Sequence, residues 1–195
     1  FLRKHPPQIV NHGLRAWGYV LPQTAAEAVL RRAHQSAFDG AALAKVLARD
    51  PSGHMYYIRY AIAGSPGEYV TVGTTRPETM LGDTAIAFHP EDERYRHLIG
   101  KRALVPVANR SIPFVGDDKV EREFGTGLVK VTPAHDPADF ELGRRHSLPG
   151  IAVIDRHGTM TEAAGADFAG LTVEEARERL LQRLRAENLV VREEK

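Results

Sequence analysis

Two stretches of the sequence place polar side chains directly after apolar, strand-like runs. The first is "TTRPETMLGD" at positions 74–83, and the second is "VKVTPAHDPADFE" at positions 129–141. Together they supply hydroxyls, cations and carboxylates, which can bind a polar ligand and orient a water molecule. The residues concerned are Thr74, Thr75, Arg76, Thr79, Lys130, Thr132, His135, Asp136 and Asp139.

The spacing within the second stretch favours a polar face held by a rigid turn. Side chains alternate along a strand, so Lys130 and Thr132 share one face, which suits either an exposed edge or a polar pocket. Two prolines, at 133 and 137, fix φ on either side of residues 134–136 and limit their freedom. A simpler interpretation also stands: Asp136 is a helix N-cap, and Asp139 occupies the third helical position, where the helix dipole favours a carboxylate.

The first stretch also has a simple interpretation, which explains only part of it. Pro77 and Pro90 suit the first positions of two short helices that end at Gly82 and Gly100. In the second of these helices, the (i, i+4) pairs Asp92–Arg96 and Glu93–His97 predict a solvated face. Residues 74–79 carry more polar groups than two helix caps require, so the first segment indicates a site.

Several kinds of chemistry have no support in the sequence. There is no cysteine, which excludes disulfides, thiolate zinc sites and a cysteine nucleophile. His135 and His146 do not form a metal-binding spacing, and the sequence has neither a phosphate-binding P-loop nor the nucleophile elbow of serine hydrolases. "FGTG" at 124–127 is too short to be a phosphate loop and predicts a turn before a strand. We therefore expect neither a metal nor a cofactor.

The composition indicates an ordered globular chain. It has 195 residues, of which 43% are hydrophobic and 26% charged, enough for one domain with a sizeable core. The net charge of +1 excludes a strongly basic nucleic-acid binder but permits a local basic patch. No apolar run approaches the ~20 residues that span a bilayer. A cytoplasmic protein without membrane contact is expected.

The periodicity divides the chain into an accessory segment, residues 1–54, and a main domain, residues 55–195. In the accessory segment, two helices are predicted over 24–40 and 41–49. In the main domain, strands are predicted at 55–62, 69–75, 84–88, 103–107, 112–115, 128–132 and 151–155. A capping box at Thr172 and Glu175 begins a helix that ends near Asn188, with its Arg and Glu residues on a solvated face. The predicted fold is α/β, of the α+β type: a largely antiparallel, barrel-like core with peripheral helices.

Four linked motifs in this order resemble the editing domain inserted in class I valyl-tRNA synthetases. They are "TTRPETMLGDTAIAFHPEDERY", "LIGKRA", "FGTGLVKVTPAHDPADFELGRRHSLP" and "IDRHGTMTEAAG", and the resemblance covers about residues 55–192. "TTRPET" together with "KVTPAHDPADFE" favours the valyl enzymes over the leucyl and isoleucyl ones. Residues 1 to about 50 depart from the family pattern, and the synthetic signatures "HIGH" and "KMSKS" are absent.

The resemblance implies an aminoacyl-tRNA deacylase that hydrolyses Thr-tRNA(Val). Its partners would be the acceptor end of tRNA(Val) carrying mischarged threonine and the remainder of a parent valine-tRNA ligase. It implies that Asp139 binds the substrate ammonium, that Asp136 and Thr132 lie near its hydroxyl, and that Arg76 and Lys130 face the terminal nucleotide or the ester carbonyl. The remaining wall residues implied are Thr74, Thr75, Pro77, Thr79, Phe124 and His135.

Three alternatives remain from the sequence. One is the editing domain of an isoleucyl- or leucyl-type synthetase. Another is a free-standing deacylase that acts in trans, which the unmatched N-terminal segment keeps open. The third is a noncatalytic tRNA-binding module in which Arg144 and Arg145 dominate and the aspartates are only caps.

Overall fold

The computed structural model describes residues 54–195. Only the last residue of the accessory segment 1–54 is among the described residues. The helices predicted at 24–40 and 41–49 lie outside them. The domain boundary between residues 54 and 55 therefore stays a prediction.

The main domain opens with an antiparallel hairpin of β1 (Met55–Ile62) and β2 (Tyr69–Thr74), as the alternating pattern predicted. Tyr56, Ile58 and Tyr60 point into the core, and Tyr56 is paired with Thr74 at the end of β2. The register therefore leaves the polar segment that follows Thr74 at one end of the hairpin.

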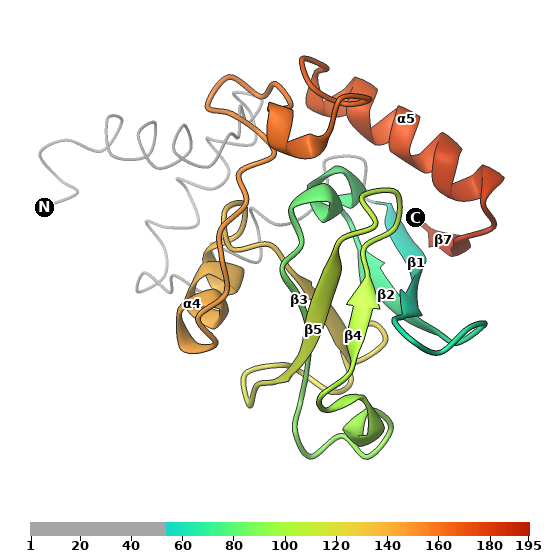
Figure 1. Cartoon of the computed structure of the whole chain (residues 1–195), viewed down its shortest axis with the longest axis vertical. Helices are drawn as coiled ribbons and strands as arrows, with labels where there is room; N and C mark the ends of the chain where they lie inside the picture. The colour runs from blue at the N-terminus through green and yellow to red at the C-terminus, as the bar shows by residue number, and fades with distance from the viewer. Residues whose placement is uncertain (1–53) are drawn as a thin grey trace, which may run out of the picture.

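Seven strands of the described residues form one mixed sheet that curls into a nearly closed barrel (Figure 1). The remaining strands are β3 (Ala85–Phe88), β4 (Arg102–Leu104), β5 (Ser111–Gly116), β6 (Leu128–Val131) and β7 (Val190–Glu194). Six of the strands follow one another in the order β2-β1-β4-β5-β3-β6, and β7 pairs with β1 beside this path. All pairs are antiparallel except β3 with β5. The two end strands, β2 and β6, lie side by side without a connecting ladder. We call this line of contact the seam.

Helices lie at the periphery, which confirms the predicted fold class (Figure 1). The longer ones are α4 (Pro137–Arg145) and α5 (Val173–Ala186), and short 3-10 helices are η1 (Pro77–Gly82), η2 (Arg96–Leu98) and η3 (Glu162–Ala164). The capping box of Thr172 and Glu175 is present, and Ala176, Leu180 and Leu184 bury the inner face of α5 against the core. No helix within residues 54–195 is long and apolar enough to cross a bilayer.

The helix predicted from Pro90 to Gly100 is wrong. The segment forms turns and only the short η2, and Asp92 is 5% exposed rather than solvated. Its carboxylate accepts hydrogen bonds from the backbone and the guanidinium of Arg94, so it caps a turn instead of pairing with Arg96. Arg96 forms its ion pair with Glu93 at 2.8 Å. A carboxylate that satisfies a turn locally competes with helix formation.

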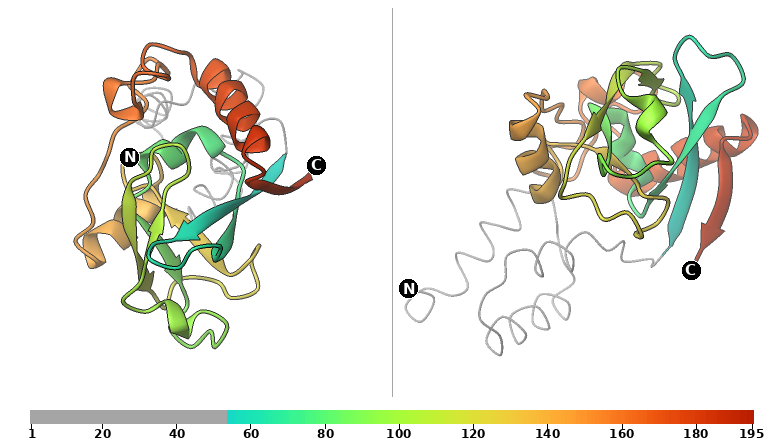
Figure 2. Two further views of the ribbon diagram at one scale, coloured as in Figure 1. Left: turned by 45° about the vertical axis from the view of Figure 1, so that its right-hand side comes forward. Right: turned by 90° about the horizontal axis from the view of Figure 1, so that it is seen from below.

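The strands differ from the predictions at three places. The strand predicted at 103–107 ends at Leu104, because residues 106–108 form a turn. Residues 151–155 form no strand and make only a single bridge, Ile154 with Met160. In contrast, β7 was not predicted, because its sequence "VVREE" has little alternation. It pairs antiparallel with the start of β1, with Met55 opposite Glu194, so β1 and β7 run together at one edge of the barrel (Figure 2).

Candidate active site

A pocket of about 250 Å³, lined mainly by residues with polar side chains, opens at the seam between β2 and β6. Four segments line it: the end of β2 with the segment before η1, η1 itself, β6 with the residue after it, and the first turn of α4. The lining residues are Gly73, Thr74, Thr75, Arg76, Thr79, Val129, Lys130, Thr132, His135, Asp136, Ala138 and Asp139. The two polar stretches of the sequence thus meet in space.

Asp83 organises the buried side of this pocket. It is fully buried directly after η1, and its carboxylate accepts hydrogen bonds from the Tyr60 hydroxyl at 2.7 Å and the Thr132 hydroxyl at 2.7 Å. The ammonium of Lys130 lies 3.2 Å from the same carboxylate. Burial raises the pKa of Asp83, while the charge of Lys130 and these hydrogen bonds oppose that rise.

Lys130 joins the two walls of the pocket. Besides Asp83, its Nζ donates to Thr132 Oγ1 at 2.6 Å and to Thr79 Oγ1 at 2.8 Å. All three ammonium protons are therefore used within the protein. A buried ion pair satisfied in this way is costly to break, because either partner alone would leave an uncompensated charge.

The backbone behind this network needs a glycine at position 82. A Cβ there would lie 2.8 Å from the carbonyl oxygen of Ile151 and 3.2 Å from the side chain of Thr132. Gly82 therefore lets η1 pack closely against the segment 151–155 and places Asp83 beside Thr132.

The first turn of α4 contributes two carboxylates. Asp136 is the N-cap, and its Oδ1 accepts from the backbone N–H groups of Ala138 and Asp139, so the capping interpretation is correct for this residue. Asp139 accepts from the backbone N–H of Thr132 at 2.8 Å. Burial, together with the negative charge of Asp136, raises the pKa of Asp139 to about 7. Asp139 therefore lies close to the balance between its neutral and ionised forms at neutral pH.

His135 is an anchor for the backbone. Its Nε2 accepts hydrogen bonds from the backbone N–H groups of Val153 and Ile154, so this nitrogen carries no proton. Burial, with the nearby charges of Arg76 and Lys130, lowers the pKa of His135 to about 4. Arg76 in turn donates to the His135 carbonyl at 2.9 Å. The histidine thus ties the segment 151–155 to the pocket.

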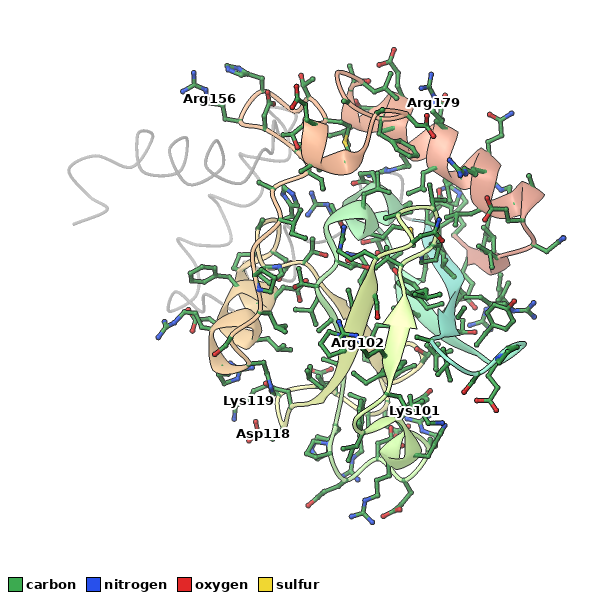
Figure 3. All side chains as sticks on the ribbon, in the orientation of Figure 1. Lys101, Arg102, Asp118, Lys119, Arg156 and Arg179 are labelled. Atoms are coloured by element: carbon green, nitrogen blue, oxygen red, sulfur yellow. The ribbon has the colours of Figure 1, made fainter. Side chains whose placement is uncertain are left out.

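An ion pair anchors η1 to the C-terminal helix. Arg177 of α5 forms hydrogen bonds of 2.8 and 3.1 Å with the fully buried Glu78, and Arg76 lies 3.7 Å from the same carboxylate. The expectation that the Arg residues of this helix only form a solvated face is therefore wrong for Arg177. It holds for Arg179, which projects from the outer side of α5 (Figure 3).

The structure brings nine of the eleven residues named from the sequence to the pocket, and two lie elsewhere. Pro77 is buried in η1 but does not line the pocket. Phe124 is 58% exposed on the loop before β6, and it is not among the lining residues. Sequence reasoning missed Asp83, Tyr60 and Glu78. The signal for Asp83 was available, because it is a lone carboxylate within the apolar run "MLGDTAIAF".

Comparisons with known proteins identify the relatives of this chain, although no family model matches it. It is 55% identical to the valine–tRNA ligase of Thermosynechococcus vestitus over 146 residues, which is 75% of this chain and 16% of the ligase. It is 53% identical to that of Bacillus subtilis over 140 residues, or 72% of this chain and 16% of the ligase. The chain thus spans about a sixth of the length of these relatives.

Solved structures share the fold at low sequence identity. A ternary complex of Agrobacterium radiobacter K84 LeuRS with tRNA and LeuAMS matches with a TM-score of 0.55 and 18% identity, over 99% of this chain and 24% of that one. The structure named GlLeuRS-CP1 matches with a TM-score of 0.54 and 13% identity, over 73% of this chain and 99% of that one. The predicted kinship is thereby confirmed: the chain is related to valyl-tRNA synthetases and has the fold of the editing (connective insertion) domain of class I synthetases.

Proposed function

We propose that this chain hydrolyses the ester of mischarged Thr-tRNA(Val), as the editing domain of a cytoplasmic valyl-tRNA synthetase. The observation that carries the proposal is the chemistry of the seam pocket. It combines two carboxylates, suited to an ammonium, with buried hydroxyl groups suited to a small polar side chain. Its volume of about 250 Å³ suits the aminoacyl group with part of the terminal ribose.

The need for such a pocket follows from the similarity of valine and threonine. The synthetic pocket of valyl-tRNA synthetases rejects threonine by only about a hundredfold, a figure known for these enzymes rather than obtained from this chain. A second site that hydrogen-bonds the hydroxyl discriminates better, because valine would leave its buried polar groups unpaired. This argument favours valine editing over leucine or isoleucine editing.

Asp139 binds the substrate ammonium in this mechanism. It lies beside Asp136, and an ammonium between the two carboxylates would relieve the repulsion that raises the Asp139 pKa. Binding therefore favours the ionised form of Asp139 and places the ester at the mouth of the pocket.

An oriented water molecule attacks the ester carbonyl. The hydroxyls of Thr79 and Thr132 are each buried, and each already donates its proton and accepts from Lys130. Neither is therefore well placed to serve as a nucleophile. The pocket positions the ester for this attack, and the positive charges of Arg76 and Lys130 stabilise the developing oxyanion. The attacking water passes its proton to solvent, and the C–O bond to the ribose breaks as the ribose oxygen takes a proton from solvent.

The ends of the domain suit insertion into a larger enzyme. Met55 and Glu194 are paired in adjacent antiparallel strands, so the chain enters and leaves the barrel at neighbouring points. A domain whose first and last strands pair in this way fits between two segments of a host without separating them, as the proposal of a parent synthetase requires.

The test is single-turnover deacylation by the full 195-residue chain. Thr-tRNA(Val) and Val-tRNA(Val) are incubated with excess protein, and the released amino acid is measured against the rate in buffer. We expect threonine to be released at least tenfold faster than valine, and Glu141→Gln, a change at an exposed residue of α4, to leave both rates unchanged. Binding of tRNA without hydrolysis above the buffer rate would establish the noncatalytic alternative instead.

A further inference from the structure

The hydrogen bonds around Asp83 fix the direction in which Thr132 can bond. The ammonium of Lys130, 3.2 Å from Asp83 Oδ1, favours the ionised form of this buried carboxyl group. An ionised carboxylate only accepts hydrogen bonds, and Asp83 accepts at Oδ1 from the Thr132 hydroxyl at 2.7 Å. A hydroxyl has a single proton. The proton of Thr132 is therefore directed at Asp83 and away from a ligand.

Lys130 completes this restriction. A hydroxyl oxygen has two lone pairs, and one lone pair of Thr132 Oγ1 accepts a hydrogen bond from Lys130 at 2.6 Å. Thr79 is restricted in the same way, since it donates to the carbonyl of Arg76 at 2.9 Å and accepts from Lys130 at 2.8 Å. Each threonine keeps one lone pair and no proton, while Lys130 has no proton left for a ligand.

The carboxylates add acceptors to the same pocket. Asp136 accepts from two backbone N–H groups at one oxygen, and Asp139 accepts from Thr132 N at one oxygen. In the ionised form that binds an ammonium, each carboxylate retains lone pairs. On the side of β6 and the first turn of α4, the groups that face an aminoacyl side chain and its ammonium are thus predominantly acceptors, whereas Arg76, which also lines the pocket, is a donor.

We infer that the pocket recognises its substrate's side chain as a hydrogen-bond donor, and that Asp83 sets this polarity through Thr132. The inference rests on the proposed function and narrows its substrate class to aminoacyl esters whose β-carbon carries a group with a proton to donate. Aminoacyl esters whose side chains have the same size but can only accept a hydrogen bond are therefore not substrates, and neither is the valine ester. Asp83 is a positioning residue, and Thr132 is the group that contacts the substrate.

The experiment compares three tRNA(Val) esters with the full chain: threonine, valine, and the threonine analogue in which fluorine replaces the hydroxyl. Fluorine is close to a hydroxyl in size, and it has no proton to donate. Because fluorine also activates the ester, each enzymatic rate is divided by the rate of hydrolysis in buffer. We expect threonine to be hydrolysed roughly ten- to hundredfold faster than the fluorinated analogue, and the analogue to resemble valine.

Variants show whether the preference for threonine comes from the direction of the hydrogen bond or from a general loss of packing in the pocket. Thr132→Ser keeps the hydroxyl and its bond to Asp83, so the ratio of threonine to analogue should stay high. Thr132→Val removes the acceptor, so the ratio should fall towards one. Tyr60→Phe removes a hydrogen bond at the other oxygen of Asp83 and should keep the ratio even if it lowers stability.

Each outcome decides the matter. If the analogue is hydrolysed within about threefold of threonine while valine is spared, the pocket donates to the substrate and the inference is overturned. A Thr132→Val variant that folds and keeps the wild-type ratio would also overturn it. If the wild-type chain does not hydrolyse even the threonine ester, the proposed function fails first, and the inference fails with it.

Discussion

Replacing Asp139 by Asn should remove editing activity while making the protein more stable at alkaline pH. Asn keeps the shape of the side chain and an oxygen that can accept from the backbone N–H of Thr132, as Asp139 does at 2.8 Å. It lacks the charge that an ammonium requires. Because Asn does not titrate, the variant isolates the effect of the carboxylate from that of its packing.

The size of the effect follows from the pKa of Asp139, which burial and Asp136 raise to about 7. In an unfolded chain the same carboxyl has a pKa of about 3.9. Since the folded pKa is the higher one, the folded chain holds the proton more tightly. Stability is therefore lost as the pH rises between these two values. The total loss is at most about 4 kcal/mol, of which about 2–3 kcal/mol falls between pH 5 and pH 8.5.

Urea denaturation of the wild type and of Asp139→Asn at these two pH values measures the effect. The stability of the variant relative to the wild type should increase by about 2–3 kcal/mol from pH 5 to pH 8.5. Glu141→Gln, on the exposed side of the same helix, should show no such change. A difference independent of pH would contradict the proposed environment of Asp139, and hydrolysis of Thr-tRNA(Val) by the folded variant would refute its role with the ammonium.

Four further outcomes are expected. The kcat/KM of the wild type should rise about fivefold from pH 6 to pH 7 as Asp139 ionises, before the substrate's α-amino group begins to lose its proton. A flat profile in this range after correction for hydrolysis in buffer would contradict this. His135→Ala should lower the free energy of unfolding by about 1–3 kcal/mol, because two backbone N–H groups lose their acceptor. The folded variant should retain substantial activity and the inflection of its pH profile near neutral pH. Loss of that inflection would make His135 the base. Arg177→Met should lower the free energy of unfolding by roughly 3 kcal/mol, because it leaves Glu78 without its main partner. Arg179→Met, at an exposed site, should lower it by less than about 0.5 kcal/mol. Equal losses in urea denaturation would refute the role of Arg177 in anchoring η1 to α5. A chelator should leave the rate of hydrolysis unchanged, since residues 54–195 hold no cluster of three or more His, Asp or Glu suited to a metal. Inhibition by the chelator that is reversed when metal is added would contradict this.

Local pattern was sufficient for much of the fold and for most of the pocket. Alternation predicted β1 and β2, and the capping box predicted the start of α5. The two polar stretches were identified because each has more polar groups than its turn requires. Linked motifs then indicated that the stretches belong to one site, a conclusion that neither stretch supports alone.

Features that depend on distant contacts were not predictable in this way. Arg177 has the same local pattern as Arg179, and only its contact with Glu78, 99 positions earlier in the chain, distinguishes the two. β7 has no strand pattern of its own because it is exposed on both faces, and it exists through its pairing with β1. Phe124 lies in a suggestive motif, but its loop precedes β6, whereas most of the pocket's residues on that side lie at or after the end of β6.

The position of the pocket at the seam explains why its polar network is both functional and structural. β2 and β6 lie side by side without a hydrogen-bonded ladder, so side chains must hold this part of the barrel together. Lys130 on β6 contacts Thr79 on η1 and Asp83 after it, while Arg76 reaches the His135 carbonyl across the pocket. A complete ladder at this place would leave no opening for an aminoacyl group. The same gap that admits the ligand therefore requires a buried ion pair, and the hydroxyls that satisfy this ion pair are the ones available to select the ligand.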